Sequence, residues 1–190
     1  MENQIIFFVS LVIALTIHEF SHAFVADKFG DPTPRAYGRV SLNPLKHLDF
    51  FGTIMLFIVN FGWGKPVPID PYNLTKREEI LVGLAGPASN FVLAIFFALV
   101  IQFIPLSIFI IFIQTNLVLG IFNLLPIPPL DGSKILLNIL PEEQSIQWQE
   151  AFEQYGFLLL AVLLFLPVGG SNIIHLIISP ILSFFLRLLI

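Results

Sequence analysis

The chain has 190 residues, of which 56% are hydrophobic and only 12% are charged, with a formal net charge of −4. Soluble domains are about one quarter charged, so this composition indicates a membrane protein. The lack of cysteine excludes disulfides, thiolate nucleophiles and cysteine-ligated zinc. No long basic run is present, which argues against a nucleic-acid partner.

Five apolar stretches predict membrane-spanning helices, because crossing a bilayer takes roughly 20 mostly apolar residues. They cover about 5–25, 79–104, 106–125, 152–168 and 173–189. The first stretch lacks the basic flank and the cleavage site of a signal peptide, so we expect it to be retained. We therefore predict an all-α polytopic bundle of about five spans, forming a single membrane domain over residues 1–190. Its last two spans would form a helical hairpin over about 152–190.

The segment over about 31–75 differs from its surroundings, because it holds most of the polar, proline and glycine residues. Within it, AYGRVSL and GKPVPIDP are typical of short strands. The apolar run FFGTIMLFIVNF is too short to cross a bilayer. Irregular backbone at membrane depth needs protein or a wet cavity around it. We expect a re-entrant or interfacial loop with short β-strands, folded against the spans. The later stretch PEEQSIQWQEAFEQ is predicted to be only a polar connector.

Basic residues predict the orientation of the chain. With five spans, all 9 lysines and arginines fall on one side: most in the first long loop, Lys134 after the third span and Arg187 at the end of the last. The positive-inside rule makes that side cytoplasmic and places the N-terminus outside. We therefore expect a multi-pass protein of the cell membrane.

The stretch HEFSH places His18, Glu19 and His22 inside the first span. On a helix the two histidines lie on one face, one turn apart, where they can bind one metal ion, and Glu19 can accept a proton from water there. The alternative is a helix whose histidines are satisfied by hydrogen bonds. Each ionisable group inside a span costs a few kcal/mol, which metal ligation would offset. His18 would lie roughly 20 Å into the ~30 Å apolar layer, nearer the cytoplasm.

A catalytic zinc ion usually has three protein ligands, so two histidines leave one position open. Asp131, in NLLPIPPLDG, is the best third candidate. The prolines before it forbid a regular helix, which lets its carboxylate bend back towards His22. The alternative is an Asp-Gly turn at the start of a helix.

The stretch GLAGPASNF suggests close helix packing, since Gly83, Gly86 and Ser89 form a face of small residues. Asn90, in the same stretch, either bonds across the bundle to the active site or only joins neighbouring helices. His175, in the last span, is expected to pack rather than bind metal.

The motifs HEFSH, GRVSLNPLKH, FGWGKPVP, GPASN and NLLPIPPLDG, in this order over about 5–134, closely resemble the site-2 protease family of intramembrane zinc metalloproteases. The resemblance implies one Zn²⁺ held by His18, His22 and Asp131, with Glu19 as the catalytic acid and base. It also implies that Asn123 assists catalysis or steadies the substrate.

The resemblance further implies regulated cleavage of membrane-anchored protein substrates, which the loop over about 35–72 would present in extended form. Many relatives carry a PDZ or CBS domain. We expect a minimal core with neither, which leaves open an oligomer or a regulatory membrane partner.

Two other classes of protein remain as alternatives. A metal transporter could use intramembrane His and Asp, but it would spread its ligands along a path over several helices. An inactive membrane scaffold would not need the full set of ligands and a neighbouring glutamate.

Overall fold

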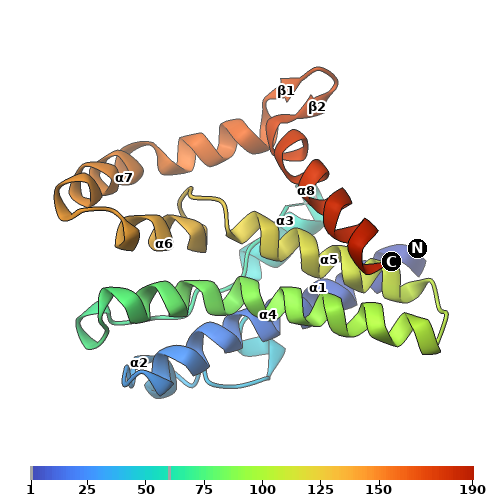
Figure 1. The fold of residues 1–190 in the computed structure, drawn as a ribbon, viewed down its shortest axis with the longest axis horizontal. Coiled ribbons are helices and arrows are strands. Elements are labelled where there is room, and N and C mark those ends of the chain that lie inside the picture. The colour runs from blue at the N-terminus through green and yellow to red at the C-terminus, as the bar shows by residue number, and fades with distance from the viewer. Residues whose placement is uncertain (1, 60) are drawn as a thin grey trace.

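The computed structural model describes residues 2–59 and 61–190, which are mostly helical (Figure 1). The longer helices are α1 (Glu2–Lys28), α3 (Phe50–Val59), α4 (Lys76–Phe103), α5 (Ile108–Asn123), α6 (Asp131–Ile139), α7 (Glu142–Phe165) and α8 (Ile173–Leu189). The short elements are α2 (Thr33–Ala36), the 3₁₀ turns η1 (Pro44–Lys46) and η2 (Pro71–Asn73), and the strands β1 (Pro167–Val168) and β2 (Ser171–Asn172). The predicted all-α class is confirmed.

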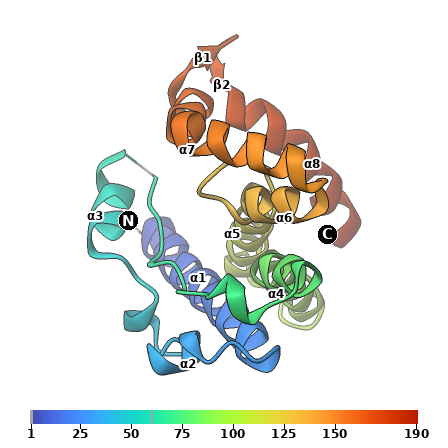
Figure 2. The ribbon, with the colours of Figure 1, turned by 90° about the vertical axis from the view of Figure 1, so that its left-hand side faces the viewer.

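Helices α1, α4 and α5 pack against one another and form the centre of the molecule (Figures 1 and 2). Within the described residues, two helices are long and apolar enough to cross a membrane: Gln4–Lys28 and Lys76–Phe103. Helix α5 has 16 residues, which rise only about 24 Å along the axis. The five-span arrangement therefore stays a prediction.

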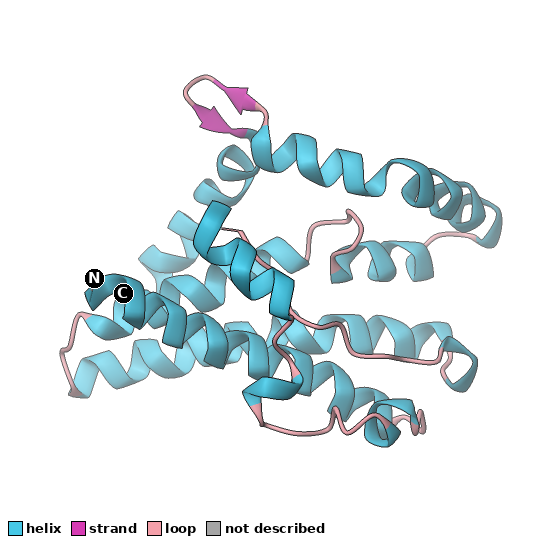
Figure 3. Cartoon of the chain, turned by 180° about the vertical axis from the view of Figure 1, so that it is seen from behind, coloured by secondary structure: helices cyan, strands magenta, loops and turns pink. Residues whose placement is uncertain are grey.

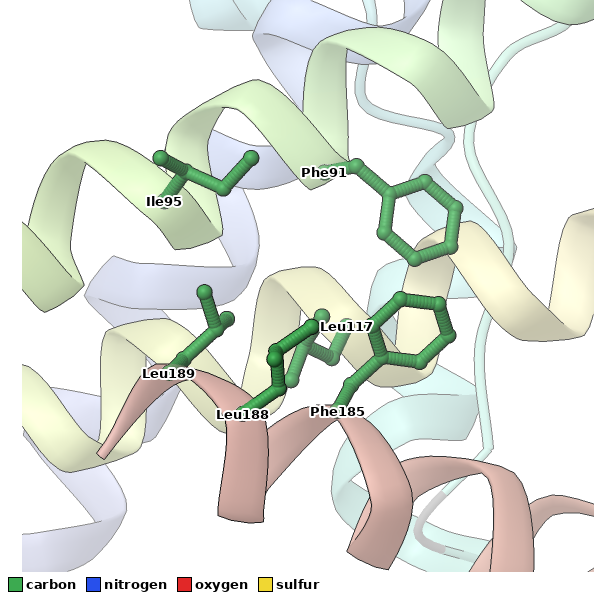
Figure 4. A pocket seen from close by; sticks show the side chains of 6 residues that line it. All are labelled: Phe91, Ile95, Leu117, Phe185, Leu188 and Leu189. Carbon is green, nitrogen blue, oxygen red and sulfur yellow. The ribbon is translucent and has the colours of Figure 1, made fainter.

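A second contact region joins α4, α5 and α8 around a core of small and branched side chains: Ala94, Ala98, Ile113, Leu117, Ile121, Ile174 and Ile178. Beside this core lies a crevice of about 240 Å³ between the same helices (Figure 4). Its lining residues are Phe91, Ile95, Leu117, Phe185, Leu188 and Leu189, all of them apolar. A crevice lined in this way offers no group for acid–base or metal chemistry.

The loop between α1 and α4 folds along α1, as expected. The ring of Phe57 in α3 lies 5.3 Å from that of Phe8 in α1. Buried Asp31 joins the two ends of the loop, since its carboxylate accepts bonds from the backbone N–H groups of Thr33 (3.0 Å) and Asp70 (2.9 Å). Burial alone would raise the pKa of Asp31, but the hydrogen bonds that it accepts outweigh burial and lower it.

The predicted strands of this loop did not form as strands. The two predicted segments do not pair, and the loop contains one isolated bridge, between Leu48 and Gly64, among the residues described. Pro66 and Pro68 have no N–H to donate to a ladder. The carbonyls of Lys65 and Pro66 accept from the side chain of Arg39 instead of from a neighbouring strand.

The C-terminal part also differs from expectation, because helix α7 begins at Glu142, well before the predicted start at Phe152. The supposed connector contains strong helix formers, and Glu142 and Glu143 stand in the first turn, where the helix dipole favours acidic residues. Helices α7 and α8 are joined by the β1–β2 hairpin (Figure 3), whose turn residues Gly169 and Gly170 have positive φ.

Candidate metal centre

Three side chains from two distant parts of the chain meet at one point in the bundle. The Nε2 atoms of His18 and His22, one turn apart on α1, lie 3.1 Å from each other. Each also lies 3.1 Å from Oδ2 of Asp131, the first residue of α6. All three residues are buried. The structure therefore brings together the three residues that the sequence suggested as ligands.

The other ring nitrogen of each histidine is held by an acceptor on α4. Nδ1 of His18 donates to Oδ1 of Asn90 over 2.7 Å, and Nδ1 of His22 donates to the backbone carbonyl of Val82 over 2.6 Å. The orientation of the Asn90 amide follows from its own bonds, because its Nδ2 donates to the carbonyl of Ala14 and to Oδ1 of Asn116, both over 3.1 Å. Such partners fix the tautomer and direction of a metal-binding imidazole.

Because both Nδ1 atoms donate, the lone pairs of the two Nε2 atoms face each other and the carboxylate of Asp131. With the proton of each neutral ring on Nδ1, both Nε2 atoms are acceptors, and the carboxylate of Asp131 is an acceptor too. One extra proton would bridge only one pair of these three atoms, whereas a divalent cation satisfies all of them at once. These three acceptor atoms therefore form a candidate cation site.

The spacing fits zinc. Nitrogen and oxygen ligands about 2.0–2.1 Å from a tetrahedral zinc ion lie roughly 3.3 Å apart, close to the 3.1 Å between each pair of ligand atoms. Gly86 of α4 provides the space for the rings, because a methyl group there would overlap the Nε2 atoms of both His18 and His22. The small-residue face of α4 thus serves the histidines as well as helix packing.

Asp131 reaches the histidines through an irregular approach. Residues 124–130 form turns and bends, and α6 then begins at Asp131 itself. Gly132 allows the close passage, since a side chain there would strike the backbone carbonyls of Leu124 and Leu125. The two alternatives weighed for Asp131, ligand and helix start, therefore describe the same residue. Its other oxygen lies 3.7 Å from Nζ of Lys134.

Glu19 is half-buried beside His18 and faces a charged residue of the loop. Its Oε2 lies 3.9 Å from Nη2 of Arg39, whose side chain is 5% exposed. The motifs pointed to no part in the active site for Arg39 or for the buried His47 next to it. The signal that could have found them is their place in GRVSLNPLKH, where ionisable residues occur within a loop expected against the membrane.

A cavity of about 400 Å³ opens beside the ligands. His22 and Asp131 line it, together with a wall formed by the loop segment 67–69 and another formed by Glu79, Val82 and Gly83 of α4. Two of the three candidate ligands can thus be reached from a cavity that the loop helps to form.

Asn123 had been expected to assist the reaction, and Asn90 either to bond to the active site or only to join neighbouring helices. Asn90 is fully buried and makes both kinds of bond that were considered for it, one to His18 and others to neighbouring helices. The amide of Asn123 donates to the carbonyl of Leu119, one turn back in α5, over 2.9 Å. This bond does not link it to the three ligands, so its catalytic role stays a prediction.

Comparison with known families agrees with this site. The model of Peptidase family M50 matches residues 6–107 and 102–167. The chain belongs to this family, the site-2 protease family. The resemblance seen in the motifs is therefore confirmed.

Curated relatives of this M50 member carry consistent names. A Bacillus subtilis protein named "Putative zinc metalloprotease YwhC" is 42% identical, and the match covers 85% of this chain and 81% of the relative. Rip2 of Mycolicibacterium smegmatis, named in the same way, is 36% identical over 82% of this chain and 65% of its own length. Zinc metalloprotease MJ0392 of Methanocaldococcus jannaschii is 26% identical over 97% of this chain and 50% of its own. No solved structure matches this M50 chain significantly.

Gly86→Ala is predicted to weaken zinc binding, because the added methyl group would displace both imidazoles. Zinc per chain, measured by metal analysis after purification with a weak chelator, should fall well below that of the wild type. Gly83→Ala, one turn earlier in α4, is the matched control, since its methyl group would lie 3.0 Å from Cγ1 of Ile135 and contact no imidazole. Equal loss of zinc from both variants would contradict the idea that Gly86 makes room for the ligands.

Proposed function

We propose that this zinc metalloprotease of family M50 hydrolyses peptide bonds within or beside the membrane-spanning segments of membrane-anchored proteins. The observation that carries the proposal is the meeting of His18, His22 and Asp131 inside a bundle of apolar helices. Bonds cut at such a site must come from a substrate that enters the same apolar layer. We accordingly propose one zinc ion per chain.

His18, His22 and Asp131 are proposed to hold the zinc ion, with Asn90 and the Val82 carbonyl fixing the two rings. When bound, zinc supplies a Lewis acid that polarises a carbonyl and lowers the pKa of water. The buried position keeps the electrostatic effect of the cation strong, because little water surrounds it. Asn90 would therefore affect catalysis through the direction of His18.

Glu19 is proposed to act as general base and then as general acid. Its carboxylate would take a proton from the attacking water while the water oxygen forms a bond to the peptide carbonyl carbon. It would then give this proton to the amide nitrogen as the C–N bond breaks. Asn123 is proposed to donate to the carbonyl oxygen as negative charge develops there, after turning away from Leu119.

The substrate must be unwound near the cleavage site, because an intact helix keeps its carbonyls in its own hydrogen bonds. The wall at 67–69 is suited to bind an extended peptide. Lys65 and Asp70 already donate their backbone N–H groups, to His47 and Asp31 respectively. The N–H groups of Val67 and Ile69 have no acceptor among the residues that the structure describes, so we propose that they pair with the substrate by strand addition.

The chain is further proposed to cross the cell membrane five times, through α1, α4, α5, α7 and α8, with its N-terminus outside. The basic residues support this orientation. The active site would then lie within the bilayer towards the cytoplasm, and water would reach it through the cavity beside His22.

A metal transporter is the runner-up function, and the geometry favours it less. Its ligands would mark a path across the membrane, whereas here they converge on a single centre in the described part of the chain. The outer bonds to α4 lock the histidines in place, which suits a resident cation better than one in transit.

Glu19→Gln is predicted to abolish cleavage without loss of zinc, because the amide cannot accept a proton but does not touch the ligands. In detergent, with zinc and a single-span test substrate, the rate should fall by about 10²–10⁴-fold. Zinc per chain should equal that of the wild type. Equal cleavage by both forms would overturn the assignment as a protease that uses Glu19.

His22→Ala and Asp131→Ala are each predicted to lower bound zinc, since either change leaves two ligands. Metal analysis of the purified proteins measures this directly. His175→Ala, which removes an exposed histidine of α8, is the control and should keep the zinc of the wild type. Unchanged zinc in all three variants would refute the ligand assignment.

The proposed orientation predicts which residues a membrane-impermeant thiol reagent can reach. The chain has no cysteine, so single cysteines give clean labelling. On intact cells Leu106→Cys and Val168→Cys should be labelled, whereas Tyr72→Cys, at a position 97% exposed, should react only in inverted vesicles. Labelling of Tyr72→Cys from outside would reverse the orientation, and protection of Val168→Cys would rule out five spans.

A further inference from the structure

Arg39 is a buried cation that the proposed reaction does not use. It belongs to the loop between α1 and α4, and only 4% of the residue is exposed. Removing a charge from water costs several kcal/mol unless partners compensate for the loss. The carboxylate nearest to it in the described part of the chain is that of Glu19, 3.9 Å away. The cost of burying Arg39 is therefore met partly by the proposed catalytic base.

Arg39 also donates hydrogen bonds to the two residues before the cavity wall at 67–69. Nη1 donates to the carbonyl of Pro66 over 2.7 Å, and Nη2 donates to the carbonyl of Lys65. These two residues directly precede the segment 67–69, which lines the cavity beside His22 and Asp131. One guanidinium thus lies 3.9 Å from the carboxylate of Glu19 and bonds to the two residues that precede the segment along which a peptide would lie.

The ring of His47 lies next to the guanidinium of Arg39. The residue is fully buried, and burial lowers the pKa of its ring, with smaller contributions in the same direction from Arg39 and Lys46. Its Nε2 donates to the carbonyl of Ser41 over 2.6 Å, so Nδ1 is free to accept from Nη2 of Arg39, 3.5 Å away. The backbone carbonyl of His47 also accepts from the N–H of Lys65 over 2.8 Å. The loop is therefore fastened near Lys65 by bonds that do not involve Arg39.

We propose that Arg39 is a positioning residue, which holds the carboxylate of Glu19 in a fixed relation to the cavity wall at 67–69 through its bonds to Lys65 and Pro66. The inference rests on the proposed function, because it assigns Arg39 a purpose only if Glu19 acts on a peptide in that cavity. The backbone hydrogen bond from Lys65 to His47 already holds the loop. A purely structural role would therefore not require Arg39 to lie beside Glu19. An arginine suits this place because its planar fork can reach two carbonyls and a carboxylate at once, which a lysine cannot do.

The test uses the full chain in detergent with zinc and the single-span substrate. We expect Arg39→Met to keep zinc and to keep KM within about threefold, while kcat falls by about 10²-fold, because a misplacement of about 1 Å costs that much. Arg39→Lys should restore part of the loss, since it returns the charge without the fork. Arg35→Met is the matched control: it removes an exposed arginine of the same loop, paired with Asp27, and should behave as the wild type.

A role in loop structure alone gives a different pattern. Arg39→Met would then raise KM and leave kcat unchanged, as would His47→Gln, which loosens the same loop without removing the charge beside Glu19. That result would overturn the proposal. If Arg39→Met does not fold, Arg39→Lys decides: a lower kcat at unchanged KM supports the positioning role, and wild-type kinetics refute it.

A thermal double-mutant cycle tests the contact without any activity. In the zinc-loaded protein, the shifts in midpoint caused by Glu19→Gln and Arg39→Lys should not add, because the two side chains interact. Additive shifts would contradict the inference. If the wild type itself cleaves nothing, the proposed function fails, while the cycle still reports whether Arg39 and Glu19 are coupled.

Discussion

The structure depends on one constraint: three atoms with lone pairs, from His18, His22 and Asp131, meet inside an apolar bundle. Buried lone pairs that face one another repel, and a single divalent cation can satisfy all three at once. The neighbouring buried amides help to hold these three side chains in place. Asn90 is oriented by Asn116 and in turn orients His18, so the buried amides form one chain of bonds that ends at the ligands. Such a network leaves little freedom in how α1, α4 and α5 pack.

The meeting of the three candidate ligands could be predicted because their signal is local or chemical. His18 and His22 stand one helical turn apart, and a carboxylate after a run of prolines is free to bend inward. The spacing of residues along one helix does not show which residues of other helices lie opposite its face. Gly86 was therefore predicted as a packing residue, although its lack of a side chain is what admits the two imidazoles. Asn90 was left with two interpretations for the same reason, and the bundle satisfies both.

The loop and the C-terminal part were harder to predict, for opposite reasons: tertiary contacts override local propensity in the loop, whereas in the C-terminal part helix propensity outweighs polarity. In GKPVPIDP the carbonyls of Lys65 and Pro66 bond to the side chain of Arg39, and three of the eight residues are prolines, so no ladder forms. The strands appear instead at a break between helices, where two glycines allow a tight turn. The stretch from Glu142 looked like a connector because it is polar, yet polarity does not prevent a helix when the residues favour one.

The few free donors of the cavity wall limit how a peptide could lie against it. Between Lys65 and Asp70, the prolines and the bonds made among residues 2–59 and 61–190 leave only the N–H groups of Val67 and Ile69 for a substrate. Positions two apart on an extended chain face the same edge, so a paired peptide can shift only in steps of two residues without losing both bonds. Each such step moves the peptide by about 6.6 Å, which is larger than the distance over which a fixed carboxylate can take part in proton transfer. A site built in this way would select the cleaved bond through the register of the peptide, and it would do so only while Glu19 and the wall keep their relative positions.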